Sequence, residues 1–139
     1  MISRLPVTIV RACLRARLLV PVTTRAALTA LAPDSGQLAA VCDRLGFLGC
    51  YVHSVEAGSG RIAARMFAPS IGVPEDIANA NSTACLAADL AGRGVTAITV
   101  DMGDSLGAPA TITASATGGS GVRLGGAAEV VGVDLVRLS

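Results

Sequence analysis

The segment Ser82–Ala91 constrains the fold more than any other, because it has the composition of a helix that is apolar nearly all round. Its sequence, STACLAADLA, places small or apolar side chains at almost every position. A helix of this kind has no face suited to water and must be buried among other elements. Asn79 or Asn81 is predicted to cap its start, and Gly92 to end it. We therefore expect a central helix that the rest of the chain surrounds.

The remaining elements are predicted from apolar periodicity and from turn residues. Two helices are expected at Arg25–Leu31, capped by Thr23 or Thr24, and at Gly36–Leu45, capped by Ser35. Strands are expected at Leu5–Val10, Leu14–Val22, Phe47–Ser54, Arg61–Phe67, Thr96–Met102, Ala110–Ala116, Gly121–Leu124 and Glu129–Leu138, with a hairpin turn at Gly58–Gly60 and a loop at Pro69–Pro74. The period-two alternation of Arg61–Phe67 is typical of a half-buried strand. This order predicts an α+β domain, in which a curved, mixed and mostly antiparallel sheet wraps around the central apolar helix.

The composition limits the classes of partner. Apolar residues make up 52% of the 139 positions but aromatic residues only 2%, so the core of this one domain must be built from Ala, Val, Leu and Ile. Few aromatic side chains leave little for stacking on bases, and a net charge of +1 gives no basic excess for a phosphate backbone. We expect no binding to nucleic acid.

Membrane, secretion and metal signals are also missing from the sequence. No apolar run reaches the ~18 residues of a membrane span, and arginines interrupt the apolar runs near the N-terminus. The four cysteines include no C-x-x-C pair, so we expect no metal site and reduced thiols. These features predict a soluble cytoplasmic protein.

An acidic pair, Glu75 and Asp76, lies just before the central helix. A helix N-terminus offers unpaired N–H groups and the positive end of a dipole, which can bind a substrate carboxylate. A partly desolvated carboxylate beside it can accept or donate a proton. The alternative is that Asp76 and Asn79 merely cap the helix.

Three other polar residues are interpreted as structural. His53 stands alone on a predicted strand, with no catalytic partner that the sequence can name. Asp101 and Asp104 flank Met102-Gly103 and are interpreted as turn residues.

Three segments carry a resemblance to a known family. They are ARMFAPSIGVPEDIANANSTACLAADLAGRG, VDMGDSLGAPATITAS and VRLGGAAEVVGVDL. In this order they resemble the C-terminal half of the phenazine-biosynthesis (PhzF-like) isomerase family, which has R-x-F-x-P-x-x-G-x-x-E-D-P-A-T-G-S-A before a helix. The resemblance covers roughly Arg15–Leu138, and residues 1–14 are expected to form an extra segment of uncertain structure.

The resemblance implies a fold and an activity. The family has two similar domains, each a sheet around a central helix as in diaminopimelate epimerase, with a cofactor-free active site between them. There a carboxylate of the first domain and the Asp of the E-D-P segment shuttle a proton on a small acid. Asp76 matches that Asp, and Glu75 the Glu before it. The T-G-S-A positions become Asn79, Ala80, Asn81 and Ser82, the expected substrate-binding residues, and Ile77 replaces the family's Pro.

Three interpretations stay open because the N-terminal domain is missing. The chain could be an isomerase of specialised-metabolite biosynthesis, acting on a small acid and completed by a homodimer or by a separate N-terminal-type half. It could instead be a degenerate half-domain that serves as a ligand-binding or protein-interaction module. It could also be the remnant of a longer gene product.

Overall fold

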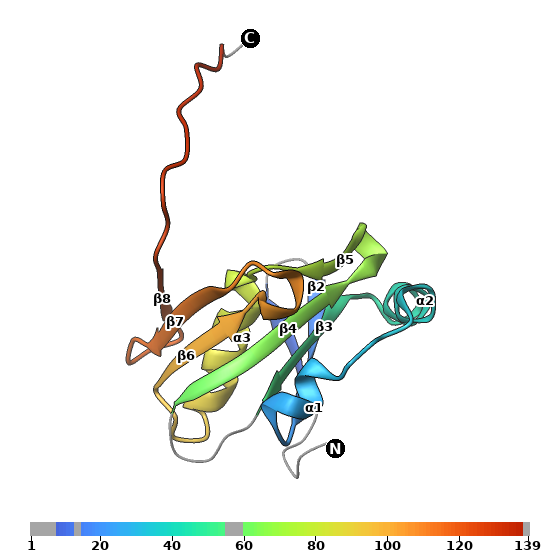
Figure 1. Ribbon diagram of the computed structural model, residues 1–139. Coiled ribbons are helices and arrows are strands. Elements are labelled where there is room, and N and C mark those ends of the chain that lie inside the picture. Colours follow the sequence, from blue (N-terminus) through green and yellow to red (C-terminus); the bar gives the residue numbers. More distant parts are fainter. Residues whose placement is uncertain (1–7, 13–14, 55–59, 138–139) are drawn as a thin grey trace.

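Helix α3 (Ala80–Ala91) lies inside the molecule, as its composition predicts. A computed structural model describes residues 8–12, 15–54 and 60–137, and in it the curved sheet packs around this helix (Figure 1). The buried residues of α3 are Ser82, Thr83, Cys85, Leu86, Ala87 and Leu90. Asn79 caps the helix, as predicted, although α3 begins two residues before the predicted start.

Within these described ranges, eight strands form one mixed sheet, which confirms the predicted fold class. They are β1 (Thr8–Ala12), β2 (Arg15–Val22), β3 (Phe47–Ser54), β4 (Arg61–Ala68), β5 (Val73–Asp76), β6 (Ala97–Met102), β7 (Ala110–Ala116) and β8 (Val122–Gly126). The order across the sheet is β1-β2-β3-β4-β6-β7-β8, and β5 also pairs with β4. The pairs β2–β3 and β4–β6 are parallel, and the other pairs are antiparallel.

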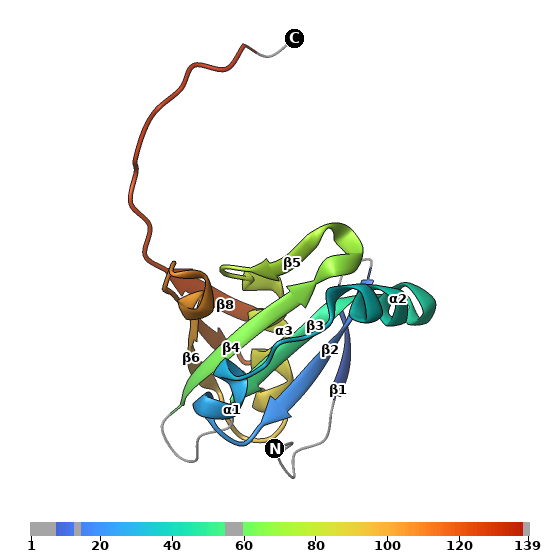
Figure 2. The ribbon, with the colours of Figure 1, turned by 45° about the vertical axis from the view of Figure 1, so that its right-hand side comes forward.

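Helices α1 (Arg25–Thr29) and α2 (Ser35–Leu45) connect β2 to β3 on the outer side of the sheet (Figure 2). Leu28 of α1 packs with Ala63 and Phe67 of β4. The other face of β4 packs toward α3 through residues such as Met66. The prediction of a half-buried β4 was therefore wrong, because α1 covers the face that was expected to meet water.

The helix caps are partly as predicted. Thr24 caps α1, and its hydroxyl accepts a hydrogen bond from the Ala27 N–H at 3.0 Å. Asp34, and not Ser35, caps α2, because its carboxylate accepts from the Gln37 N–H at 2.8 Å. Asp34 has the extended backbone of a cap, which leaves Ser35 as the first helical residue.

The predicted loop Pro69–Pro74 was wrong in part. A 3-10 turn at Pro69–Ile71 leads into β5, which places Glu75 and Asp76 in a strand. The reason is the length of β4. Its neighbour β6 pairs with Arg61–Ala63 alone, so the second half of β4 has a free edge that β5 occupies.

The C-terminal prediction also differs from the structure. No strand forms at residues 129–137, which extend away from the domain (Figure 1). No neighbouring strand of this chain pairs with that segment among the described residues. Other predictions lie partly outside the described residues, namely those for Leu5–Val7, Leu14, Gly58, Ser59, Leu138 and Cys13. Cys42, Cys50 and Cys85, which are described, are free thiols as expected.

Gly49 of β3 provides a test of sheet packing. A Cβ at this position would lie 2.4 Å from the Phe67 carbonyl oxygen, which is held in the neighbouring strand β4. We expect Gly49→Ala to lower the free energy of unfolding by about 1–3 kcal/mol. Gly119→Ala is the control, because its Cβ would meet no atom within 4 Å. Urea unfolding of both variants decides, and equal stability would contradict this account of the packing.

Buried His53 makes stability depend on pH. Its side chain lies in β3 at 5% exposure, and burial lowers the pKa from 6.5 to about 4. The neutral ring therefore favours the folded state fully above pH 6.5, and this contribution falls as the pH drops toward 4. From pH 7.5 to pH 5 we expect a loss of about 2 kcal/mol in unfolding free energy, measured with urea. His53→Gln should remove this slope, and an unchanged slope would show that another group causes it.

Candidate functional site

Two different strands, β6 and β5, pair with successive halves of β4, and the sheet divides between them. Residues Arg61–Ala63 pair with β6, whereas Met66 and Ala68 pair with β5 along the same edge. The start of α3 lies under this division. The Ser82 hydroxyl donates to Met66 Sδ at 3.6 Å, so the first helical turn contacts the β5-paired half of β4.

A second set of contacts joins the helix start to β6. Tyr51 is fully buried, and its hydroxyl forms a 2.8 Å hydrogen bond with Thr83 Oγ1 of α3. It also donates to Met102 Sδ at 3.8 Å. Burial raises the pKa of Tyr51, so this hydroxyl stays protonated and serves as a fixed contact. The helix start is thereby held to both sides of the division.

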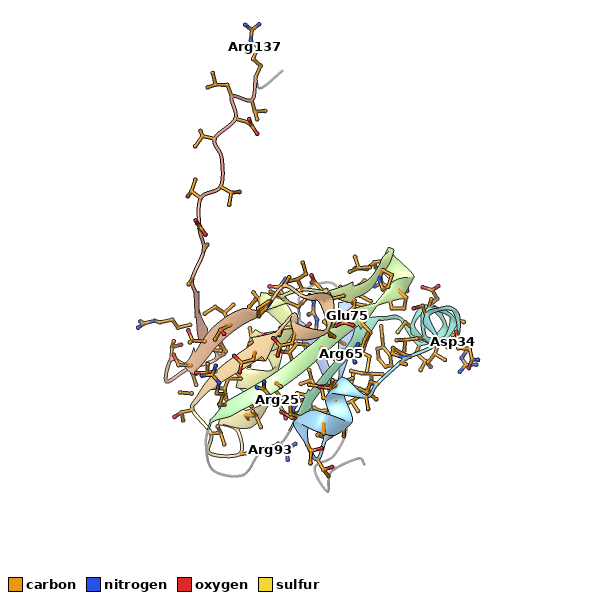
Figure 3. The ribbon with its side chains drawn as sticks, in the orientation of Figure 1. Arg25, Asp34, Arg65, Glu75, Arg93 and Arg137 are labelled. Atoms are coloured by element: carbon orange, nitrogen blue, oxygen red, sulfur yellow. The ribbon has the colours of Figure 1, made fainter. Side chains whose placement is uncertain are left out.

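On the outer side of the sheet, Glu75 of β5 bridges this division through hydrogen bonds with Arg65 of β4 and with Ser105, which follows β6. Arg65 Nη2 lies 2.6 Å from Glu75 Oε1 and its Nε 3.2 Å from Oε2, and Ser105 Oγ donates to Oε2 at 2.7 Å. Arg65 also donates to the carbonyl oxygens of Leu28 and Leu31. Arg65 and Glu75 lie close together in Figure 3. Burial opposes ionisation of Glu75, but the bonds from Arg65 and Ser105 outweigh it and hold the pKa below its usual value.

Asp101 forms a second charged cluster on the same side. Arg61 and Arg25 each donate to its carboxylate at 2.9 Å, and Thr111 donates at 3.0 Å. Burial acts against ionisation, but these donors together keep the pKa of Asp101 below its usual value. Asp101 lies in β6, so its interpretation as a turn residue was wrong, whereas Asp104 does begin a turn.

Asp76 lies on the opposite face of β5 from Glu75, because neighbouring strand residues point to opposite sides. It is half-buried and stands across from Met66, on the side that faces α3. Asp76 Oδ2 accepts from Asn79 Nδ2 at 3.0 Å, and Asn79 Oδ1 accepts from the Ser82 N–H at 2.8 Å. Asn79 therefore couples this carboxylate to the positive end of the helix.

An open groove lies beside the helix start. Its volume is about 420 Å³, and its lining residues are Ala78 and Ala80, with Ala110, Thr111, Ile112, Leu124, Gly125, Gly126 and Ala127 of the β7–β8 side. Ala80 and Asn81 are exposed, and their N–H groups have no partner within the helix. The groove therefore brings a polar helix end against an apolar wall.

The structure separates the six predicted site residues into two sets. Asp76, Asn79, Ala80 and Asn81 come together around the exposed helix start. Glu75 and Ser82 have structural contacts, to Arg65 and Met66 respectively.

Arg65 and Ser105, the partners of Glu75, were not predicted as site residues from the sequence. A single charged residue within the apolar run Ile62–Ala68 was the available signal for Arg65, whereas nothing in the sequence pointed to Ser105. Across residues 8–12, 15–54 and 60–137, no three His, Cys, Asp or Glu side chains gather as metal ligands. None of the described helices has the length and apolar character needed to cross a bilayer.

Comparisons with known proteins agree with this fold. The PhzC-PhzF family, described as "Phenazine biosynthesis-like protein", matches residues 3–133. A search of curated proteins gave no match.

Three similar solved structures have low identity to the chain. A PhzF-family phenazine biosynthesis protein from Enterococcus faecalis has a TM-score of 0.62 at 16% identity, over 78% of this chain and 42% of that one. A protein of the same family from Bacillus anthracis gives 0.60 at 13%, over 79% and 41%. A predicted epimerase from Pseudomonas aeruginosa gives 0.60 at 24%, over 86% and 43%. The chain thus spans about two fifths of each, and the likeness shows a shared fold of the diaminopimelate epimerase type.

The ion pair Arg65–Glu75 is expected to stabilise the folded protein at the place where β5 and β6 meet β4. Both side chains are about nine-tenths buried, at 12% and 11% exposure, so removing one charge leaves the other without its partner. We expect Glu75→Gln to lower the free energy of unfolding by about 3 kcal/mol at pH 7. Asp89→Asn is the matched control, because its pair with Arg93 is more exposed and is expected to contribute less than about 0.5 kcal/mol.

Urea unfolding as a function of pH provides the second readout of this pair. The pKa of Glu75 is lower in the folded protein, so its contribution is present above the unfolded value of 4.5 and is lost as the pH falls through the folded value. Equal costs for Glu75→Gln and Asp89→Asn would show that the buried pair has no special role.

Proposed function

The chain belongs to the PhzC-PhzF family of phenazine biosynthesis-like proteins, and on that basis we propose that it catalyses isomerase- or epimerase-type proton transfer on a small carboxylic or amino acid. The membership confirms the resemblance that the sequence carries. The family description and the predicted epimerase among the similar structures both favour this class of reaction. In this proposal the reaction uses no cofactor and belongs to the biosynthesis of specialised metabolites.

One observation carries the proposal: a half-buried carboxylate, Asp76, is coupled through Asn79 to an exposed helix start. The substrate carboxylate would bind the free N–H groups of Ala80 and Asn81, where the helix dipole favours negative charge. Asp76 would then take a proton from the carbon next to that carboxylate. The same helix end would stabilise the negative charge that develops as the proton leaves.

The other predicted site residues have supporting roles in this scheme. Asn79 orients Asp76 and caps the helix through one side chain. Ser82 is buried and holds the first turn against Met66, so it acts on the substrate through the helix. Glu75 forms its ion pair with Arg65 and fixes β5, the strand that ends at Asp76.

A second subunit is part of the proposal for two reasons. The groove at the helix start is open, and the chain spans only about two fifths of its structural relatives. A proton shuttle also needs a second group on the other face of the substrate. A homodimer would bring a second Asp76, and two neighbouring carboxylates separate into one acid and one base. A separate N-terminal-type half could supply that group instead.

A non-catalytic module is the second candidate. The observation that favours it is the use of Glu75 and Ser82 in structural contacts, at two positions where the family resemblance places the site. In that case the groove would bind a small acid without transferring a proton.

Hydrogen–deuterium exchange at carbon separates the two candidates. The protein is incubated in deuterated water with a panel of small amino and hydroxy acids, and NMR follows the signal next to the carboxylate. We expect exchange with at least one acid, and a loss of at least about 100-fold in Asp76→Asn. Asp43→Asn, an exposed carboxylate on α2, is the control and should retain the full rate. Binding without exchange would favour the module, and undiminished exchange in Asp76→Asn would remove this residue from the mechanism.

A further inference from the structure

The C-terminal tail, residues 127–137, exposes more apolar side chain than any other part of the described chain. It leaves β8 and runs away from the domain in both views (Figures 1 and 2). The exposed fractions are 82% for Val130, 95% for Val131, 88% for Val133, 102% for Leu135 and 81% for Val136. A contiguous apolar stretch of this kind marks an interaction site in a soluble protein.

The tail has the pattern of a strand. Val131, Val133 and Leu135 follow at spacings of two, so an extended backbone places all three on one face. Valine is also a strong strand former. A strand with one apolar face is stable when it pairs with a sheet edge and packs on neighbouring side chains. The tail therefore requires a sheet edge to pair with.

Strand β8 provides such an edge. It is the last strand in the order of the sheet and pairs with β7 on one side. Its residues Arg123, Leu124, Gly125 and Gly126 are exposed. An edge strand offers a row of N–H and C=O groups to an incoming strand.

The tail of the same molecule is poorly placed to use this edge. Only Ala127 and Ala128 separate β8 from Glu129, and a two-residue reversal favours Asn-Gly or Gly-containing pairs over Ala-Ala. The tail instead runs outward from the end of β8 (Figure 1). An edge on another molecule is then the available partner.

We propose that the tail is donated to a second copy of this chain. The tail of each protomer pairs antiparallel with β8 of the other, about a twofold axis. One segment carries both the donated strand and the accepting edge, so a single twofold operation satisfies both at once. The charges also favour this pairing, because β8 carries Arg123 whereas Glu129 and Asp134 outnumber Arg137 in the tail and give it a net negative charge.

This assembly also bears on the groove at the start of α3. Leu124, Gly125 and Gly126 of β8 form part of its wall, so a donated tail along β8 borders the groove. The inference deepens the proposed function and rests on it for the role of the groove, whereas the pairing itself rests on the tail and the edge.

The mass of the full chain in solution tests the pairing. Light scattering during size-exclusion chromatography should give twice the 13.8 kDa of one chain. The triple variant Val131→Lys/Val133→Lys/Leu135→Lys should give the mass of one chain, with urea unfolding showing that the domain remains folded. Ile71→Lys, which changes a 47% exposed apolar residue outside the tail, should stay dimeric. A full chain of single mass, or a triple variant that stays dimeric, would overturn the proposal.

A synthetic peptide identifies the partner as the β8 edge. A peptide of residues 127–137 in excess should shift the full chain toward single mass, and a peptide with the three lysines should not. Leu124→Lys in the full chain should weaken the dimer, because Leu124 lies on the accepting edge. A dimer insensitive to both the peptide and Leu124→Lys would show that the copies meet elsewhere and would overturn the proposal. Proton exchange is measured on the same samples, so a dimer without exchange refutes the catalytic role alone.

Discussion

Burial of α3 is the constraint on which the rest of the structure depends. The helix presents small apolar side chains in nearly every direction, so it needs cover on several sides, and one curved sheet provides most of it. The scarcity of aromatic residues fits this arrangement, because small side chains allow the helix and the strands to approach closely. Tyr51 is the aromatic residue of the buried cluster around α3, and its hydroxyl forms hydrogen bonds with Thr83 and Met102.

The sheet around this helix is divided beside β4, and the division gives two neighbouring carboxylates different environments. Glu75 points outward to Arg65 and Ser105 and is fixed as part of an ion pair. Asp76 points inward to Asn79 at the helix start. The alternation of side chains along β5 turns the two carboxylates to opposite sides of the sheet, where they meet different partners. In the proposed function Asp76 therefore acts on the substrate, whereas Glu75 positions β5.

Within the described part of the chain, the same architecture leaves the outer edge of β8 and the C-terminal tail without a paired strand. β8 ends the sheet, and the tail continues from it with its apolar residues in water. The chain spans only about two fifths of the length of its solved relatives. In the proposed assembly, a second subunit covers both the open groove and the exposed tail.

By itself the sequence determined the identity of most elements and the central position of α3, because these follow from local periodicity and from caps such as Thr24 and Asn79. It also located the segment that carries the candidate site. Only the tertiary structure decided that β4 is buried on both faces, that β5 is a strand, and that residues 129–137 pair with no strand among the described residues. Each of these depends on which element lies alongside, and long-range pairing leaves no mark in the local pattern. The separate roles of Glu75 and Asp76 follow from the same pairing, so the sequence could name the two carboxylates but could not tell them apart.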